Sequence, residues 1–155
     1  MNFSFLELKI PPVIVVAIAA ALMWAVAWAL PAWNLALPGR AAAALAAVIA
    51  GMAVALAGVV EFRRSRTTVN PLRLDTASSL VSGGIYRITR NPMYLGFALA
   101  LLGWGIFLSN PAALAALFAF VAYMNRFQII PEEKALESLF GAEFAAYKSR
   151  VRRWL

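Results

Sequence analysis

The chain of 155 residues contains no cysteine and no histidine. Without cysteine it can form no disulfide, thiol redox centre or cysteine nucleophile, and without either residue type it lacks the usual ligands of structural zinc. The absence of histidine also excludes an imidazole as general base. Any chemistry must therefore come from arginine, carboxylate, tyrosine, amide, hydroxyl or backbone groups, and we expect no metal site.

Charged residues are also scarce, at 14% against 63% hydrophobic residues, and the mean hydropathy is +0.78. Ordinary soluble domains contain about 25% charged residues. The composition predicts an all-α integral membrane protein, with the lipid bilayer as a partner and residues 1–155 as a single membrane domain. The net charge of +7 comes from basic residues at the ends of apolar runs. This placement favours anchoring at an anionic membrane surface and argues against nucleic acid as a partner.

Four runs with few charges predict about four transmembrane helices. The first two are long enough to cross a hydrocarbon core of about 30 Å, whereas the third is short for a full span. Ser109-Asn110-Pro111 divides the third run from the fourth, and Asn110 as N-cap before Pro111 predicts a tight hairpin. With a cytoplasmic connector and a C-terminal amphipathic helix, the expected helices cover about residues 11–30, 41–62, 92–108, 111–130 and 132–153.

The connectors indicate the orientation. The segment from Arg63 to Asn91 carries six arginines, so the positive-inside rule places it and both chain termini in the cytoplasm. Turn signals at Asn70-Pro71-Leu72 and Ser82-Gly83-Gly84 predict that this connector folds back locally. The N-terminal residues lack the basic front and cleavage site of a signal peptide, so we expect a retained first helix, in a bacterial inner membrane.

Small residues mark the expected helix contacts. Ala47, Gly51 and Ala55 recur at four-residue spacing, which permits close approach of two helices. Packing within the chain is favoured over a homodimer contact, and a homo-oligomer stays open. Gly103-Trp104-Gly105 is interpreted in the same way, as a packing element rather than a cofactor motif.

The C-terminal helix carries apolar residues at helical spacing, interrupted at Gly141. They predict one stripe against the membrane or the base of the hairpin. The stripe consists of Leu136, Leu139, Phe140, Phe144, Tyr147 and Val151.

The start of the third helix is a candidate site. Asn91 is a natural N-cap and Pro92 a natural first residue, so the free N–H groups and the positive end of the helix dipole can hold an anion. Arg90 and Tyr94 add a charged donor and an aromatic face. A purely structural role, with Arg90 reaching to lipid phosphates, fits the residues equally well.

Glu132 returns to the level of Arg90 because the helical hairpin is antiparallel. It shares a helical stripe with Leu136 and therefore faces the packed side. A carboxylate in that position needs a partner, and Arg90 or Arg126 is expected to supply it. A structural ion pair would also meet this need for a partner. The spacing alone therefore does not decide between a structural ion pair and a functional site.

Four motifs in order carry a resemblance that covers roughly Thr68 to the C-terminus. The motifs are Gly84-Ile85-Tyr86-Arg87, Arg90-Asn91-Pro92-Met93-Tyr94-Leu95-Gly96, Glu132-Glu133-Lys134-Ala135-Leu136 and Phe140-Gly141-Ala142-Glu143-Phe144-Ala145-Ala146-Tyr147. Together they resemble the isoprenylcysteine carboxyl methyltransferase and phospholipid methyltransferase superfamily.

The resemblance implies an integral-membrane methyltransferase that uses S-adenosylmethionine. The cofactor would lie in a cytoplasmic pocket between the hairpin and the C-terminal segment, and a lipophilic acceptor would enter sideways from the bilayer. Asn91 stands where the family pattern has histidine. Phe144 stands where the pattern has an aromatic residue that carries a hydroxyl group. By position, Arg90 and Glu132 would be catalytic, and the cofactor would contact Tyr86, Arg90, Asn91, Tyr94, Gly96, Arg126, Glu132 and Glu133.

Two alternatives remain beside this hypothesis. On the same scaffold, the acceptor could be a phospholipid amine or a small thiol rather than a prenylcysteine-like carboxylate. From another class, the chain could be a non-enzymatic transporter or assembly factor. A transporter is expected to place polar groups at mid-membrane, whereas this sequence gathers them at the cytoplasmic ends of its helices, which favours an interfacial site.

Overall fold

The computed structural model describes residues 7–65 and 79–155. The turn predicted at Asn70-Pro71-Leu72 lies outside these residues. Short 3-10 turns occur at Pro31–Trp33 (η2), Gly84–Arg87 (η4) and Pro111–Ala113 (η5), and a π-helix, Asn125–Ile129 (η6), joins α4 to α5 without a break. The α-helices are α1 Pro12–Ala29, α2 Arg40–Arg64, α3 Pro92–Leu108, α4 Leu114–Met124 and α5 Ile130–Arg150.

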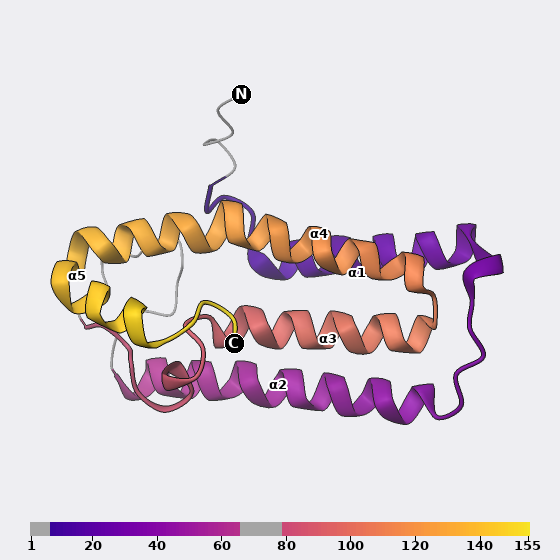
Figure 1. Ribbon diagram of the computed structural model, residues 1–155, viewed down its shortest axis with the longest axis horizontal. Helices are drawn as coiled ribbons and strands as arrows, with labels where there is room; N and C mark the ends of the chain where they lie inside the picture. The colour runs from indigo at the N-terminus through magenta and orange to yellow at the C-terminus, as the bar shows by residue number, and fades with distance from the viewer. Residues whose placement is uncertain (1–6, 66–78) are drawn as a thin grey trace.

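The long helices lie side by side, with α3 between α2 and the layer formed by α1 and α4 (Figure 1). Within the part of the chain that the structure describes, three helical runs are long and apolar enough to cross a membrane, namely Pro12–Ala29, Arg40–Arg64 and Pro111–Arg150, and α3 is a shorter apolar helix. The last run has 40 residues, about 60 Å, which is twice a hydrocarbon core. The apolar part that precedes α5 is therefore the part that can span, and the charged part from α5 onward extends beyond it.

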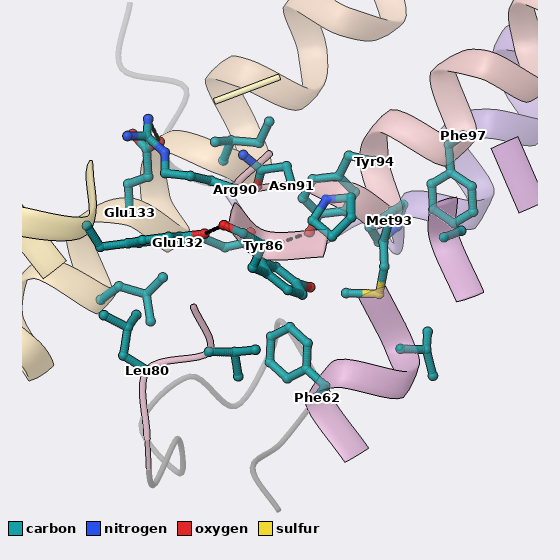
Figure 2. A pocket seen from close by; sticks show the side chains of 18 of the residues that line it. Phe62, Leu80, Tyr86, Arg90, Asn91, Met93, Tyr94, Phe97, Glu132 and Glu133 are labelled. Carbon is teal, nitrogen blue, oxygen red and sulfur yellow. Dashed lines mark hydrogen bonds and ion pairs between the residues drawn. The ribbon is translucent and has the colours of Figure 1, made fainter. Parts of the chain in front are cut away.

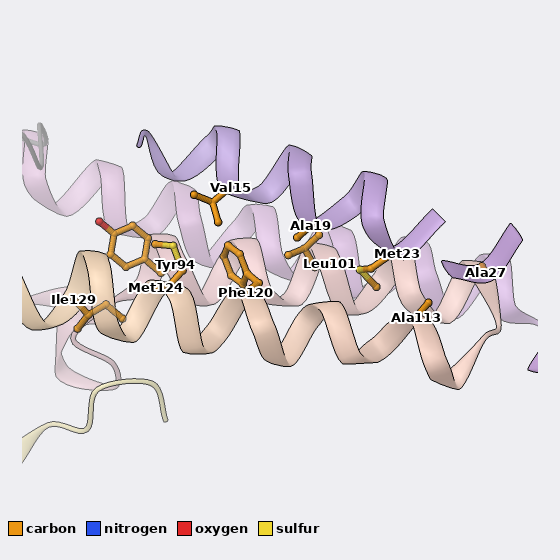
Figure 3. Packing of buried hydrophobic residues seen from close by; sticks show 10 residues of the cluster. All are labelled: Val15, Ala19, Met23, Ala27, Tyr94, Leu101, Ala113, Phe120, Met124 and Ile129. Atoms are coloured by element: carbon orange, nitrogen blue, oxygen red, sulfur yellow. The ribbon is translucent and has the colours of Figure 1, made fainter. Parts of the chain in front are cut away.

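The outer surface of the bundle is apolar. Trp28 and Phe118 are 77% and 74% exposed, which in water would leave large hydrophobic patches. The interior is a narrow column of apolar side chains from α1, α3 and α4, among them Met23, Leu101 and Phe120 (Figure 3). The prediction of an all-α membrane fold is confirmed.

Glycines hold α2 against α3. A Cβ built on Gly51 would lie 2.5 Å from the carbonyl oxygen of Gly96, and one on Gly103 would lie 2.8 Å from that of Ala44. The predicted packing of small residues within the chain is confirmed. The predicted packing role of Gly103-Trp104-Gly105 is also confirmed, because the indole N–H of Trp104 donates to the carbonyl of Ala20 at 3.1 Å.

Asn110 ties together the connections at the end of the bundle far from α5. Its side chain accepts the N–H of Ala113 at 3.2 Å, which confirms the predicted N-cap. The same amide donates to the carbonyl of Leu30 at 3.0 Å and to Oδ1 of Asn34 at 2.8 Å. Because Asn110 is buried, water cannot easily replace these hydrogen bonds.

We expect Asn110→Ala to lower the free energy of unfolding by about 2 kcal/mol, since it removes a cap and leaves buried polar groups unpaired. Thermal unfolding of the protein in detergent measures this. Asn34→Ala, which removes one of the three contacts, should have a smaller effect. Equal stability of Asn110→Ala and the unmutated protein would contradict the assignment.

The C-terminal helix differs from its prediction. At Gly141 the backbone takes φ of 47°, a region that favours glycine, and α5 folds back on itself there (Figure 1). The predicted stripe is confirmed except at one position. Leu139 is exposed, whereas the other five residues gather with Val81 and Tyr86 in a second core, namely Leu136, Phe140, Phe144, Tyr147 and Val151. The helix also ends at Arg150 rather than at 153.

Candidate functional site

The site lies where α3 begins and α5 leaves the bundle. Asn91 occupies the N-cap position and Pro92 the first helical position, as predicted. The Asn91 side chain does not cap the helix, however, and that part of the prediction is wrong. Its amide donates instead to the carbonyl of Arg153 at 2.9 Å, an acceptor brought in by the folded-back C-terminus.

A cavity of about 370 Å³ opens between η4 and the neighbouring ends of α1, α2, α3 and α5. This volume is within the range of small-ligand sites. One end of the cavity is polar, and Figure 2 shows side chains from α3, η4 and α5 gathered around it. The polar lining comprises Ser79, Tyr86, Arg90, Asn91, Tyr94, Glu132, Glu133 and Tyr147.

The rest of the cavity wall is apolar and belongs to the spanning helices. It includes Val59, Met93 and Phe97. It also includes Val13 of α1 and Leu56 of α2, which are 64% and 63% exposed on the outside of the bundle. The cavity therefore connects a polar end with the apolar outer surface.

Glu132 faces the cavity from the first turn of α5, beyond the spanning part of the helix. Its carboxylate accepts a hydrogen bond from the hydroxyl of Tyr94. Burial raises the pKa of the Glu132 carboxyl to about 7, although the bond from Tyr94 acts in the opposite direction. The predicted arginine partner for Glu132 is wrong, because Tyr94 lies directly across the cavity and Arg90 is engaged elsewhere.

Arg90 is held by two acceptors. Its Nη2 pairs with Oε1 of Glu133 at 2.8 Å, and its Nη1 donates to the carbonyl of Lys148 at 3.0 Å. The side chains of Arg90 and Glu133 are only 11% and 13% exposed, so Arg90 does not extend to lipid phosphates. Its Nε is buried and has no hydrogen-bond partner within residues 7–65 and 79–155. Arg90 therefore brings a firmly held positive charge to the cavity wall.

Tyr86 forms part of the cavity wall and is fixed by its surroundings. Gly84, with φ of 52°, lies against the carboxylate of Glu61, since an added Cβ would come within 2.5 Å of it. The hydroxyl of Tyr147 donates to the carbonyl of Tyr86 at 2.7 Å, and Phe62 meets the Tyr86 ring edge to face at 5.4 Å. The Gly-x-Tyr motif is therefore a turn that presents Tyr86 to the cavity.

Two predicted site residues lie elsewhere. Arg126 belongs to the π-helix η6, is 47% exposed, and pairs with Glu7 at 2.7 Å. Gly96 faces Gly51 in the contact between α2 and α3. Neither residue lines the cavity.

Sequence reasoning missed Arg153, which binds both oxygens of Glu133, at 3.1 and 2.7 Å. The sequence predicts Arg153 at the end of an amphipathic helix that is interrupted at Gly141, and nothing in the local pattern brings it near α3. The aromatic Tyr147 was assigned only to packing. Its position in the Phe-Gly motif was the available signal that it belongs near the site.

Comparison with known proteins identifies a family and several relatives of this chain. The family described as phospholipid methyltransferase matches residues 40–143. Protein-S-isoprenylcysteine O-methyltransferase A of Arabidopsis thaliana is 32% identical over 105 residues, which cover 67% of this chain and 53% of that protein. The corresponding enzyme of Saccharomyces cerevisiae is 39% identical over 75 residues, covering 46% of this chain and 30% of that protein.

An uncharacterized protein of Haemophilus influenzae is 48% identical over 63 residues, which are 41% of this chain and all of that protein. The chain spans about half the length of the plant relatives that it matches. No solved structure matches it. The family match extends from the start of α2 into α5 and includes most of the residues around the cavity. The chain thus belongs to the phospholipid methyltransferase family.

Proposed function

We propose that the protein transfers a methyl group from S-adenosylmethionine to a lipophilic or membrane-partitioned acceptor. The observation that carries this proposal is one cavity with two unlike parts. Its polar end holds Arg90, Glu132 and Glu133, and its apolar part reaches the exposed side chains Val13 and Leu56. A polar cofactor and an apolar acceptor could meet in such a cavity.

The residues at the polar end fit the cofactor. The guanidinium of Arg90, which lines the cavity, suits a carboxylate, whereas Glu132 suits a cationic group such as the ammonium or sulfonium. Asn91, Tyr86 and Tyr94 complete the proposed contacts, with Glu133 holding Arg90. When bound, S-adenosylmethionine supplies an electrophilic methyl group. The chain's own part is to orient the two reactants and to exclude water with apolar side chains such as Met93 and Phe97.

The acceptor decides whether a base is needed. A carboxylate, as in the isoprenylcysteine of the named relatives, can be methylated without losing a proton. A phospholipid amine or a thiol must lose one, and Glu132 is then the proposed base. We further propose a bacterial inner-membrane location with both termini and the site in the cytoplasm, on the charge distribution of the connectors.

A non-enzymatic transporter or assembly factor is the alternative from another class. The interior column of α1, α3 and α4 is formed by apolar residues, and the charged residues around the cavity are at one end of the bundle. This arrangement supports an interfacial enzyme site over a transport path.

Transfer of a labelled methyl group tests the proposal. The protein in lipid vesicles is incubated with methyl-labelled S-adenosylmethionine and, in separate reactions, with an S-isoprenyl cysteine, an amine-bearing phospholipid or an apolar thiol. We expect label in one acceptor class, above vesicles without protein, and loss of that label with Arg90→Ala. If no acceptor class gains label, the proposed reaction is wrong for these substrates.

A further inference from the structure

The last five residues, 151–155, form an extended segment that we name the C-terminal clamp. It lies beyond the family match, which ends at 143, and runs beside the start of α3 (Figure 1). Thr89 and Arg152 form a parallel bridge, and the N–H of Arg90 donates to the carbonyl of Arg152 at 3.0 Å. The carbonyl of Arg153 accepts from the side chains of Thr89 and Asn91, at 3.3 and 2.9 Å.

The side chain of Arg153 reaches across to α5. Its Nε and Nη2 bind the two oxygens of Glu133, so that the pair is bidentate. Glu133 is thereby placed between Arg153 and Arg90, and its side chain is 13% exposed. A bidentate pair fixes direction as well as distance. Arg153 consequently determines how Glu133 presents its oxygen to Arg90.

Trp154 attaches the clamp to a third element. Its indole N–H donates to Oδ1 of Asn125 at 3.0 Å, and its ring packs against the core of the bundle. Asn125 begins the π-helix η6, which precedes α5. The clamp thus joins the start of α3, the start of α5 and the turn that leads into α5.

We propose that Arg153 is a positioning residue of the cavity. It holds Glu133, which holds Arg90, and the guanidinium of Arg90 is thereby kept in position at the cavity wall. Arg153 itself does not line the cavity. The inference rests on the proposed function in one respect, which is that the ligand bound at Arg90 is the methyl donor.

The test compares Arg153→Ala with Arg150→Ala. Arg150 is an exposed arginine on α5, and its substitution removes the same charge. The Kd of S-adenosylhomocysteine is measured in detergent, well below the unfolding temperature of each variant. We expect Arg153→Ala to weaken binding about tenfold, because small displacements of a positioning group have large effects. Arg153→Lys should recover part of the loss, and Arg150→Ala should bind like the unmutated protein. Equal Kd values for the two alanine variants would overturn the proposal.

A double-mutant cycle with Glu133→Gln tests the route of the effect. If Arg153 acts through Glu133, the second substitution adds little to the first, both in Kd and in unfolding temperature. Additive effects would overturn the proposal. The unfolding cycle needs no ligand, so it separates two failures. If the unmutated protein binds no S-adenosylhomocysteine, the proposed function fails. The role of Arg153 is then judged by its coupling to Glu133 in the unfolding temperatures alone. Absence of that coupling would overturn the role of Arg153.

Discussion

With an amine or thiol acceptor, for which Glu132 is the proposed base, replacing Glu132 by glutamine should lower kcat/KM for the methyl donor by about 10²-fold, the lower end of the range for loss of a general base. The fold should survive, because the hydroxyl of Tyr94 can still donate to the amide oxygen in place of the carboxylate that it now contacts. Initial rates of methyl transfer in vesicles measure the effect. A fall in kcat identifies a base, whereas a rise in the KM of the donor identifies a group that holds its positive charge.

Glu137→Gln is the matched control, since Glu137 lies on the same helix but is exposed and pairs with Lys148. It should retain the rate of the unmutated protein. The same account expects activity to fall as the pH is lowered through about 7, because the Glu132 carboxyl, whose pKa burial raises to about 7, then becomes protonated. A Glu132→Gln variant within threefold of the unmutated rate would contradict the assigned role.

Gly96→Val should have the largest effect on stability. A Cβ at this position would lie 2.5 Å from the carbonyl oxygen of Gly51 and 2.7 Å from the Cβ of Ala55, so α2 and α3 could pack only by moving apart. We expect a loss of at least about 3 kcal/mol, as for severe overpacking of a core. Thermal unfolding and the yield of folded protein in detergent measure it.

Ala46→Val provides the comparison for this substitution. Ala46 lies on α2 but is exposed, so the same β-branched side chain should be tolerated there. If Gly96→Val unfolds at the same temperature as Ala46→Val, the close contact between α2 and α3 is not what stabilises the bundle.

Elements with strong local signals were predictable from the sequence. The helix expected at 92–108 is found at Pro92–Leu108, because a charge-free run begins at a proline that tolerates the first helical position and ends before Ser109. The N-cap at Asn110 followed from the same kind of local pattern. These features depend on residues within a few positions of one another, and a sequence displays such relations directly.

Contacts between distant residues were not predictable in this way. The acceptor for the Asn91 side chain is the carbonyl of Arg153, and its location depends on the reversal of α5 at Gly141. A glycine inside a helical pattern permits a reversal without requiring one. The arginine partner of Glu132 was not predictable for a related reason. Arg126 lies in the π-helix η6, and its exposure follows from the packing of that helix rather than from the period of an α-helix.

For the candidate site, the sequence predicted which side chains gather at one end of the bundle but not how they pair with one another. Arg90, Glu132 and Glu133 do lie together around one cavity. Helical spacing could show that the two glutamates point in different directions. It could not show that Tyr94 would hydrogen-bond to Glu132 and that Arg90 would pair with Glu133. That choice depends on side-chain lengths and on the clamp, which only the tertiary structure provides.

The central claim is that this cavity binds S-adenosylmethionine. Equilibrium binding of S-adenosylmethionine to the protein purified in detergent, measured by calorimetry beside Arg90→Ala, tests it most directly. We predict saturable binding at one site per chain, weakened about tenfold or more in the variant because a charge-assisted contact is lost. Absence of binding to the unmutated protein at millimolar concentration would contradict the account.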